Sequence, residues 1–232
     1  MTKTKLLIKF FRNLKSRFSS TNNDFNIITL NSFKYFLGCI FIINITSAQE
    51  VFNPKKISEA ALELTKQTVI YDRSYYSIPY PNGDVAQGLG VCTDVVIRTY
   101  RANGLDLQKE VHEDMTANFN LYPNIWGHKK PDTNIDHRRV PNLMTYFERQ
   151  GSKLPITNNG ADYRPGDVVA WDIGGGTTHI GVVVNIVSRD KKRYQIVHNI
   201  GAGQVLEDCL FDYKIIGHYR FLRKSNTLKK IN

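Results

Sequence analysis

Cys92 has the sequence setting of a nucleophilic thiol. Gly88 and Gly90 precede it, and an apolar pattern with helical spacing begins at or beside it. A thiol reacts as the thiolate, which the free N–H groups and the dipole at a helix N-terminus stabilise. A buried structural cysteine at a helix start is the alternative interpretation, so the available partners must decide between the two.

A catalytic thiol needs a base, and the base needs an orienting group. His179 begins an apolar, strand-like run, and a second such run contains His198. If the chain turns between them through the four residues 187–190, then His179 lies directly opposite His198, with Cβ atoms about 4.5–5.5 Å apart. We therefore predict that His198 orients His179, whereas Asn199 points to the other face. A loop of odd length would favour Asn199 instead.

Other polar residues are candidates for oxyanion or substrate contacts. The backbone N–H of Cys92 is the simplest oxyanion donor, and a second donor must complete the hole. Paired guanidinium groups match substrate carboxylates. A packed tyrosine and solvated arginines are the structural alternatives. The candidates are Tyr80, Asp94, His137, Arg138 and Arg139.

A zinc enzyme is a rival interpretation, since the chain has six histidines. None of them falls in a recognised ligand spacing such as His-Glu-x-x-His, and no Cys-x-x-Cys pair is present. The run Gly174 to Gly176 lacks the flanking pattern of a phosphate-binding loop. The sequence therefore predicts no catalytic metal and no cofactor.

The elements that must position these residues change in type along the chain. Apolar residues with helical spacing predict helices near 57–64 and from about Cys92 to Asn103. The segment 105–160 is interpreted as a long polar insertion with one short helix, 141–150. Four strands are then expected, at 168–171, 179–187, 194–200 and 214–222. Helices followed by an antiparallel sheet define an α+β fold.

The two ends of the chain differ from this domain, which we place at 49–222. Residues 1–48 contain seven Lys or Arg, an apolar run of about eleven residues at 35–45, and small residues up to Ala48. This pattern is typical of a cleaved export signal. The run is shorter than the roughly 20 residues that span a bilayer, so an uncleaved anchor, or a lipoprotein at Cys39, is less favoured. We expect export to the periplasm or cell envelope, with membrane contact only in transit, and a basic tail at 223–232.

The distribution of charge and the cysteine content argue against a nucleic-acid-binding protein and against a disulfide-bonded one. Much of the net charge of +10 belongs to residues 1–48, and no basic stripe with interleaved aromatics follows, so a nucleic-acid partner is not expected. After cleavage only Cys92 and Cys209 would remain. Their contexts differ, which favours a reactive Cys92 and a buried apolar Cys209 over a disulfide.

Three stretches carry a resemblance to a known family. Residues 90–96, 165–169 and 179–183 resemble, in order and spacing, the motifs of the NlpC-like cell-wall cysteine peptidases. More narrowly, the chain resembles the bacterial family known as domain of unknown function 1287, from about Tyr71 to Tyr219. The stretches 134–142 and 197–201 belong to that narrower likeness.

The resemblance implies a papain-like fold with the nucleophile at a helix N-terminus packed on an antiparallel sheet. It implies a Cys92, His179, His198 triad that hydrolyses an amide of peptidoglycan stem peptides through an acyl-enzyme, as an endopeptidase or an amidase. The commonest NlpC pattern has Asp-Cys-Ser-Gly at the nucleophile, whereas this chain has Val91-Cys92-Thr93-Asp94. A non-catalytic cell-wall-binding module and a cysteine acyltransferase remain as alternatives.

Overall fold

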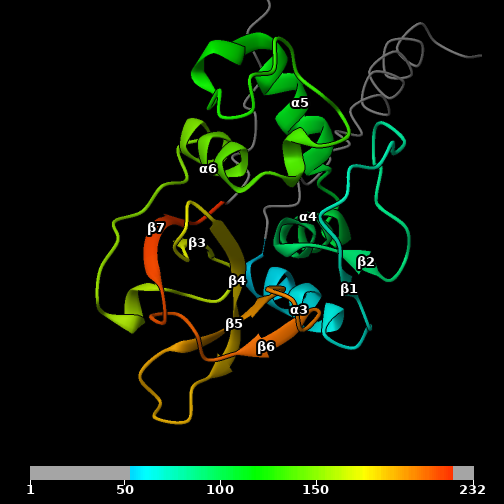
Figure 1. The fold of residues 1–232 in the computed structure, drawn as a ribbon. Helices are drawn as coiled ribbons and strands as arrows, with labels where there is room; N and C mark the ends of the chain where they lie inside the picture. Colours follow the sequence, from blue (N-terminus) through cyan, green and yellow to red (C-terminus); the bar gives the residue numbers. More distant parts are fainter. Residues whose placement is uncertain (1–52, 222–232) are drawn as a thin grey trace, which may run out of the picture. The chain divides into compact units, whose positions relative to one another are not determined.

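The structure is a computed structural model that describes residues 53–221 (Figure 1). These residues belong to the second of the two units into which the chain divides, Gln49–Asn232. The export signal expected at 1–48 and the tail expected at 223–232 lie outside the described residues. Within 53–221, no helix is long and apolar enough to cross a membrane.

A five-stranded antiparallel sheet is the centre of the fold. Its order is β6-β5-β4-β3-β7. Because side chains alternate along a strand, Ile180, Val182 and Val184 face the helices, while Gly181 and Val183 face the other side. The strands are β3 (Val168–Asp172), β4 (Thr178–Val187), β5 (Tyr194–His198), β6 (Val205–Glu207) and β7 (Lys214–Tyr219).

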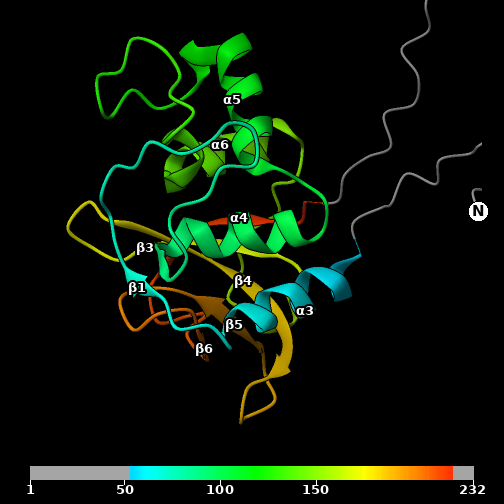
Figure 2. The same ribbon diagram turned by 90° about the vertical axis from the view of Figure 1, so that its right-hand side faces the viewer.

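Two helices lie along one face of this sheet (Figure 2). Helix α3 (Pro54–Leu64) starts at Asn53, whose side chain accepts a hydrogen bond from the N–H of Lys55. Helix α4 (Cys92–Ala102) buries an apolar stripe against β4. Before α4, the two-residue strands β1 (Ile70–Tyr71) and β2 (Leu89–Gly90) pair in parallel. The chain therefore enters α4 at Cys92 directly from an extended segment.

The segment 105–160, interpreted as a long polar insertion with one short helix, contains more helix than expected and part of the core. It contains helix α5 (Leu107–Asn118), capped by Asp106, and helix α6 (Val140–Arg149). Short 3-10 helices occur at Phe119–Leu121 and Asp136–Arg138, and a third at Gly160–Asp162. Helix α5 buries Leu107, Val111 and Met115 in the same core as α4. Only α6 was predicted, because its boundary residues Pro141 and Gly151 are clearer signals than the cap of α5.

A second apolar cluster covers the opposite face of the sheet. It contains Trp171, Val183, Ile196, Cys209 and Leu210, and Trp171 Nε1 donates to the carbonyl of Leu210 at 2.9 Å. The sheet is thus buried on both sides, and polar side chains on this second face lie away from water. The α+β class and the four expected strands are confirmed; the short strands β1, β2 and β6 were not predicted.

Candidate active site

Cys92 is the first residue of α4, and its side chain is buried. Asp94 caps the helix by accepting a hydrogen bond from the N–H of Val91 at 2.7 Å. The backbone N–H of Ile180 lies near enough to the sulfur of Cys92 to lower its pKa. Since Ile180 follows His179 directly in β4, the thiol lies beside the residue next to the expected base.

The thiol of Cys92 is neutral in the folded chain. Burial, its main cause, raises the pKa to about 11, and the Asp94 charge adds to the rise. Hydrogen bonds from N–H groups lower the pKa but do not offset the burial. The effect of burial on the thiol pKa therefore exceeds the stabilisation that the N–H groups at the helix N-terminus give to the thiolate.

His179 and His198 form a hydrogen-bonded imidazole pair. His179 Nε2 lies 2.9 Å from His198 Nδ1, and the rings meet edge to face with centroids 5.0 Å apart. The ring of His179 also stacks on Trp171. Both imidazoles are at most 3% exposed, so the pair is fixed by packing as well as by the hydrogen bond.

The predicted register of these strands is wrong, although the predicted partner is confirmed. Gly181, not His179, lies opposite His198, because the hairpin has a longer loop and a register shift after Val183. The observed register is displaced from the predicted one by an even number of residues. Because side chains alternate between the two faces of a strand, His179 and His198 still share one face. Asn199 lies on the other face, where its Nδ2 is 3.4 Å from the carbonyl of Gly90.

Glu207 extends the imidazole pair to a third group, which the sequence analysis missed. Its Oε2 lies 3.0 Å from His198 Nε2. A carboxylate only accepts hydrogen bonds, so His198 carries its proton on Nε2 and accepts at Nδ1 from His179 Nε2–H. His179 then has its lone pair on Nδ1. Burial and the neighbouring His198 lower the pKa of His179 to about 3, so this lone pair is free at neutral pH.

A cleft of about 510 Å³ opens beside Cys92. Burial and the nearby Cys92 raise the pKa of Tyr71, a cleft residue whose hydroxyl makes no hydrogen bond to any described residue. Tyr71 belongs to a two-residue strand, too short to leave a pattern in the sequence. The residues that line the cleft with Cys92 include Tyr71, Arg73, Tyr75, Trp126, Arg139 and Thr178.

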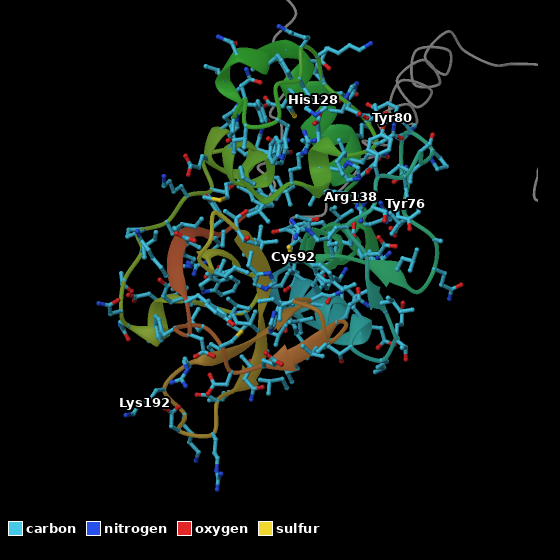
Figure 3. All side chains as sticks on the ribbon, viewed as in Figure 1. Tyr76, Tyr80, Cys92, His128, Arg138 and Lys192 are labelled. Carbon is cyan, nitrogen blue, oxygen red and sulfur yellow. The ribbon has the colours of Figure 1, made fainter. Side chains whose placement is uncertain are left out.

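Asp94 and Arg138 form a buried ion pair with each other. Arg138 Nε and Nη2 each lie 3.0 Å from an oxygen of Asp94, and both side chains are 3% exposed. Further guanidinium N–H groups donate to the carbonyls of Asp72 and Ser74. Arg138 reaches the cleft wall beside Cys92 (Figure 3), but its hydrogen bonds serve the fold and not a substrate.

The three remaining residues that were expected to contact the oxyanion or substrate lie in different parts of the structure. They are Tyr80, His137 and Arg139. Tyr80 packs edge to face on His112 with centroids 5.1 Å apart and does not line the cleft; Figure 3 shows it away from Cys92. His137 is buried outside the cleft, where burial lowers its pKa to about 3. Arg139 does line the cleft and lies over Trp126, 3.9 Å from the ring centroid. Of the five expected contact residues, Arg138 and Arg139 are therefore at the cleft.

Cys92 and Cys209 do not form a disulfide. Both are free and buried. Cys92 belongs to the core on the helical face of the sheet and Cys209 to the cluster on the opposite face. The interpretation of Cys209 as a buried small side chain agrees with this position.

A cysteine at the N-terminus of a helix thus packs on an antiparallel sheet that carries a histidine pair. The chain belongs to the family described as Domain of unknown function (DUF1287), which matches residues 58–221. It is 49% identical over 168 residues to a protein of Escherichia coli (strain K12) named "Uncharacterized protein YijF", covering 72% of this chain and 82% of that protein.

A solved structure, NlpC1 from Trichomonas vaginalis, is similar with 12% identity and a TM-score of 0.41. The match covers 75% of this chain and 46% of that one, so this chain spans less than half of its length. The fold class stated above rests on the observed elements, and the chemistry must be argued from the residues of the site.

Proposed function

We propose that this protein is an exported cysteine hydrolase that cleaves an amide bond in bacterial peptidoglycan. The observation that carries the proposal is the imidazole pair at the start of β4, in which His198 Nδ1 lies 2.9 Å from His179 Nε2. The N–H of Ile180, the residue after His179, is near enough to the sulfur of Cys92 to affect its pKa. A candidate nucleophile, base and orienting group thus all lie beside the start of β4.

The neutral state of both groups favours general-base catalysis. His179 Nδ1 accepts the thiol proton of Cys92 as the sulfur attacks the amide carbon. The protonated imidazole then gives that proton to the departing amine, and a thioester remains on Cys92. His179 next removes a proton from water, which attacks the thioester and releases the acid, and the protonated imidazole returns this proton to the departing sulfur of Cys92. His198 holds the His179 ring in the tautomer that each step needs.

The cleft supplies donors for the oxyanion. The backbone N–H of Cys92, at the start of α4, is one donor. We assign the second to Tyr71 in place of Tyr80, because Tyr71 lines the cleft beside the thiol and its hydroxyl makes no hydrogen bond within residues 53–221.

Arg73 is the substrate-binding cation of the proposal. It lines the cleft, is exposed, and has no ion pair within residues 53–221. Arg139, by contrast, lies 3.5 Å from the Asp136 carboxylate and bonds His128. A stem peptide carries carboxylates that a guanidinium binds in a bidentate manner, while Tyr75 and Trp126 contact its apolar parts.

Digestion of purified peptidoglycan tests the proposal. We expect the protein to release fragments whose new termini identify one amide bond, and Cys92→Ala to abolish the release while the polymer is still bound. Equal release by Cys92→Ala would refute a cysteine mechanism. Binding without release by the unchanged protein would favour a non-catalytic module, and transfer of the acyl group to an added amine in place of water would favour an acyltransferase.

A further inference from the structure

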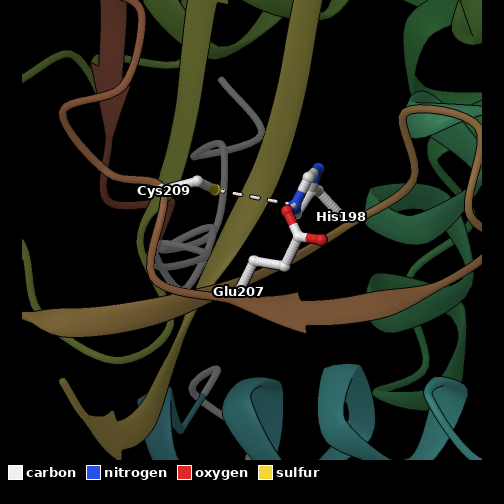
Figure 4. A group of neighbouring side chains, drawn as sticks. All are labelled: His198, Glu207 and Cys209. Carbon is white, nitrogen blue, oxygen red and sulfur yellow. Dashed lines mark hydrogen bonds and ion pairs between the residues drawn. The ribbon is translucent and has the colours of Figure 1, made fainter. Parts of the chain in front are cut away.

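Three metal-binding side chains converge at Nε2 of His198, the ring nitrogen that does not face His179. His198 Nε2 lies 3.0 Å from Glu207 Oε2 and 3.5 Å from Cys209 Sγ (Figure 4). All three donor atoms lie within 4.8 Å of one another. They come from β5, β6 and the segment that follows β6, so the sheet itself fixes their separation.

The donor set and the spacing fit a zinc-class cation. Zn²⁺ binds imidazole nitrogen, carboxylate oxygen and thiolate sulfur with bonds of about 2.0–2.3 Å, and tetrahedral angles then place such donors about 3.4–3.6 Å apart. The observed separations of 3.0 and 3.5 Å need only a small opening to reach this geometry. Calcium or magnesium would require oxygen donors instead.

The site also has an entry path and a protected side. The Glu207 side chain is 49% exposed, whereas His198 and Cys209 are buried. An ion can therefore meet Glu207 first and complete its coordination inward, with water in the fourth position. The spacing His198-x8-Glu207-x-Cys209 matches no common zinc motif, so this site could not be recognised from the sequence.

We propose that His198, Glu207 and Cys209 bind one Zn²⁺ ion, and that the bound ion inhibits the hydrolase by changing the tautomer of His179. The metal site stands on the geometry of the three donors alone. The inhibition rests also on the function proposed above, because it requires His179 to act as a base.

The coupling follows from the atoms of the imidazole pair. A metal on His198 Nε2 takes the lone pair there, so the ring carries its proton on Nδ1. His198 Nδ1–H then donates to His179 Nε2, which must accept, and His179 carries its own proton on Nδ1. The pair keeps two protons in total, while the Cys209 proton goes to solvent. His179 Nδ1–H cannot accept a proton from Cys92, so turnover stops.

Calorimetric titration with Zn²⁺ tests the site on the full chain carrying Cys92→Ala, which removes the other buried thiol. We expect one ion to bind, with a loss of about 100-fold or more in affinity when Cys209→Ala is added and about tenfold or more when Glu207→Gln is added. Asp208→Asn is the matched control, because that carboxylate pairs with Arg193 at 2.6 Å; its affinity should equal that of Cys92→Ala.

Equal zinc affinity with and without Cys209→Ala would overturn the site. Glu207→Gln guards against misfolding, since Glu207 is half exposed and its replacement leaves the core intact. Cobalt substitution gives a second readout, because a thiolate ligand produces a charge-transfer band that Cys209→Ala must remove.

Nitrogen-15 NMR of the histidine rings tests the tautomer change without any turnover. His179 should carry its proton on Nε2 in the free protein and on Nδ1 with zinc; an unchanged His179 tautomer in the zinc complex would overturn the coupling.

In the hydrolysis assay, zinc should inhibit the unchanged protein, while Cys209→Ala should keep its basal rate and resist zinc. Since binding and NMR need no hydrolysis, failure of the proposed function is distinguishable from failure of the metal site.

Discussion

Gly181 lies directly opposite His198 across the β4–β5 pair, and its missing side chain makes room for the imidazoles. A Cβ atom at position 181 would lie 3.1 Å from His198 Cβ and 2.7 Å from Ile196 Cγ2. His179 shares this face of β4, so the hydrogen bond between the two histidines passes beside the space that Gly181 leaves open. The glycine is therefore a requirement of the site and not only of the strand.

Gly181→Ala should displace His198 and break its 2.9 Å hydrogen bond to His179. We expect a loss of about 1–3 kcal/mol in the free energy of unfolding, from overpacking, together with a fall in kcat. Urea unfolding and hydrolysis assays measure the two effects. Gly174→Ala is the control: it meets no atom within 4 Å and carries only the cost of a positive φ. A Gly181→Ala enzyme with unchanged kcat would show that the imidazole pair is dispensable.

The orienting role of His198 predicts a graded series of variants. His198→Ala removes the acceptor for His179 Nε2–H, so kcat should fall by about 10²–10⁴ with KM nearly unchanged. His198→Asn keeps an acceptor oxygen in place of Nδ1 and should recover part of the lost kcat. If Asn and Ala reduce kcat equally, His198 is a packing residue. The split between kcat and KM separates orientation of the base from loss of substrate binding.

Arg73 predicts a binding defect without a chemical one. Arg73→Gln should raise KM for a carboxylate-bearing peptidoglycan fragment by about 10- to 150-fold, since one charge-assisted contact is worth about 1.5–3 kcal/mol, and should leave kcat nearly unchanged. Arg189→Gln removes the same charge from the exposed hairpin after β4 and serves as the control. Equal KM values for the two variants would remove Arg73 from the substrate site.

The helices α3, α4 and α6, the strands β3, β4, β5 and β7, and the pairing of His179 with His198 could be predicted from the sequence because they depend on periodicity. A register shift of an even number of residues leaves each side chain on the same face of its strand. His198 was therefore predicted correctly as the partner of His179, although the residue directly opposite His198 is Gly181. By contrast, Tyr71 and Glu207 belong to strands of two and three residues. Such strands carry too few side chains for an alternating pattern to show.

Burial was the other property that the sequence did not reveal. Asp94 and Arg138 were expected at a substrate, but 44 residues of separation concealed that they bind each other. The apolar spacing of Leu107, Val111 and Met115 was a usable signal for α5, which the surrounding polar residues obscured. Contacts distant in sequence, and the loss of solvent that accompanies them, decide which polar residues remain available for chemistry.

The buried ion pair of Asp94 and Arg138 predicts a large and asymmetric effect on stability. Arg138→Met leaves the Asp94 carboxylate buried without its partner, which should cost about 3–5 kcal/mol of the free energy of unfolding. Asp94→Leu combined with Arg138→Met removes both charges and should cost less than Arg138→Met alone. Urea unfolding of the two variants measures the difference. If the double variant is the less stable one, the pair contributes through packing and not through its charges.

The neutral thiol of Cys92 predicts a specific pH profile for its alkylation. Burial raises its pKa to about 11, so the thiolate fraction, and with it the rate of reaction with iodoacetamide, should rise about tenfold per pH unit from pH 7 to 10 and level off only near 11. The Cys39→Ala, Cys209→Ala variant leaves Cys92 as the sole cysteine of the three. In urea the same variant should level off near the ordinary thiol pKa of about 8.5. A thiolate–imidazolium ion pair would instead give a rate that is already high and nearly flat between pH 5 and 8, and such a profile would refute the general-base mechanism.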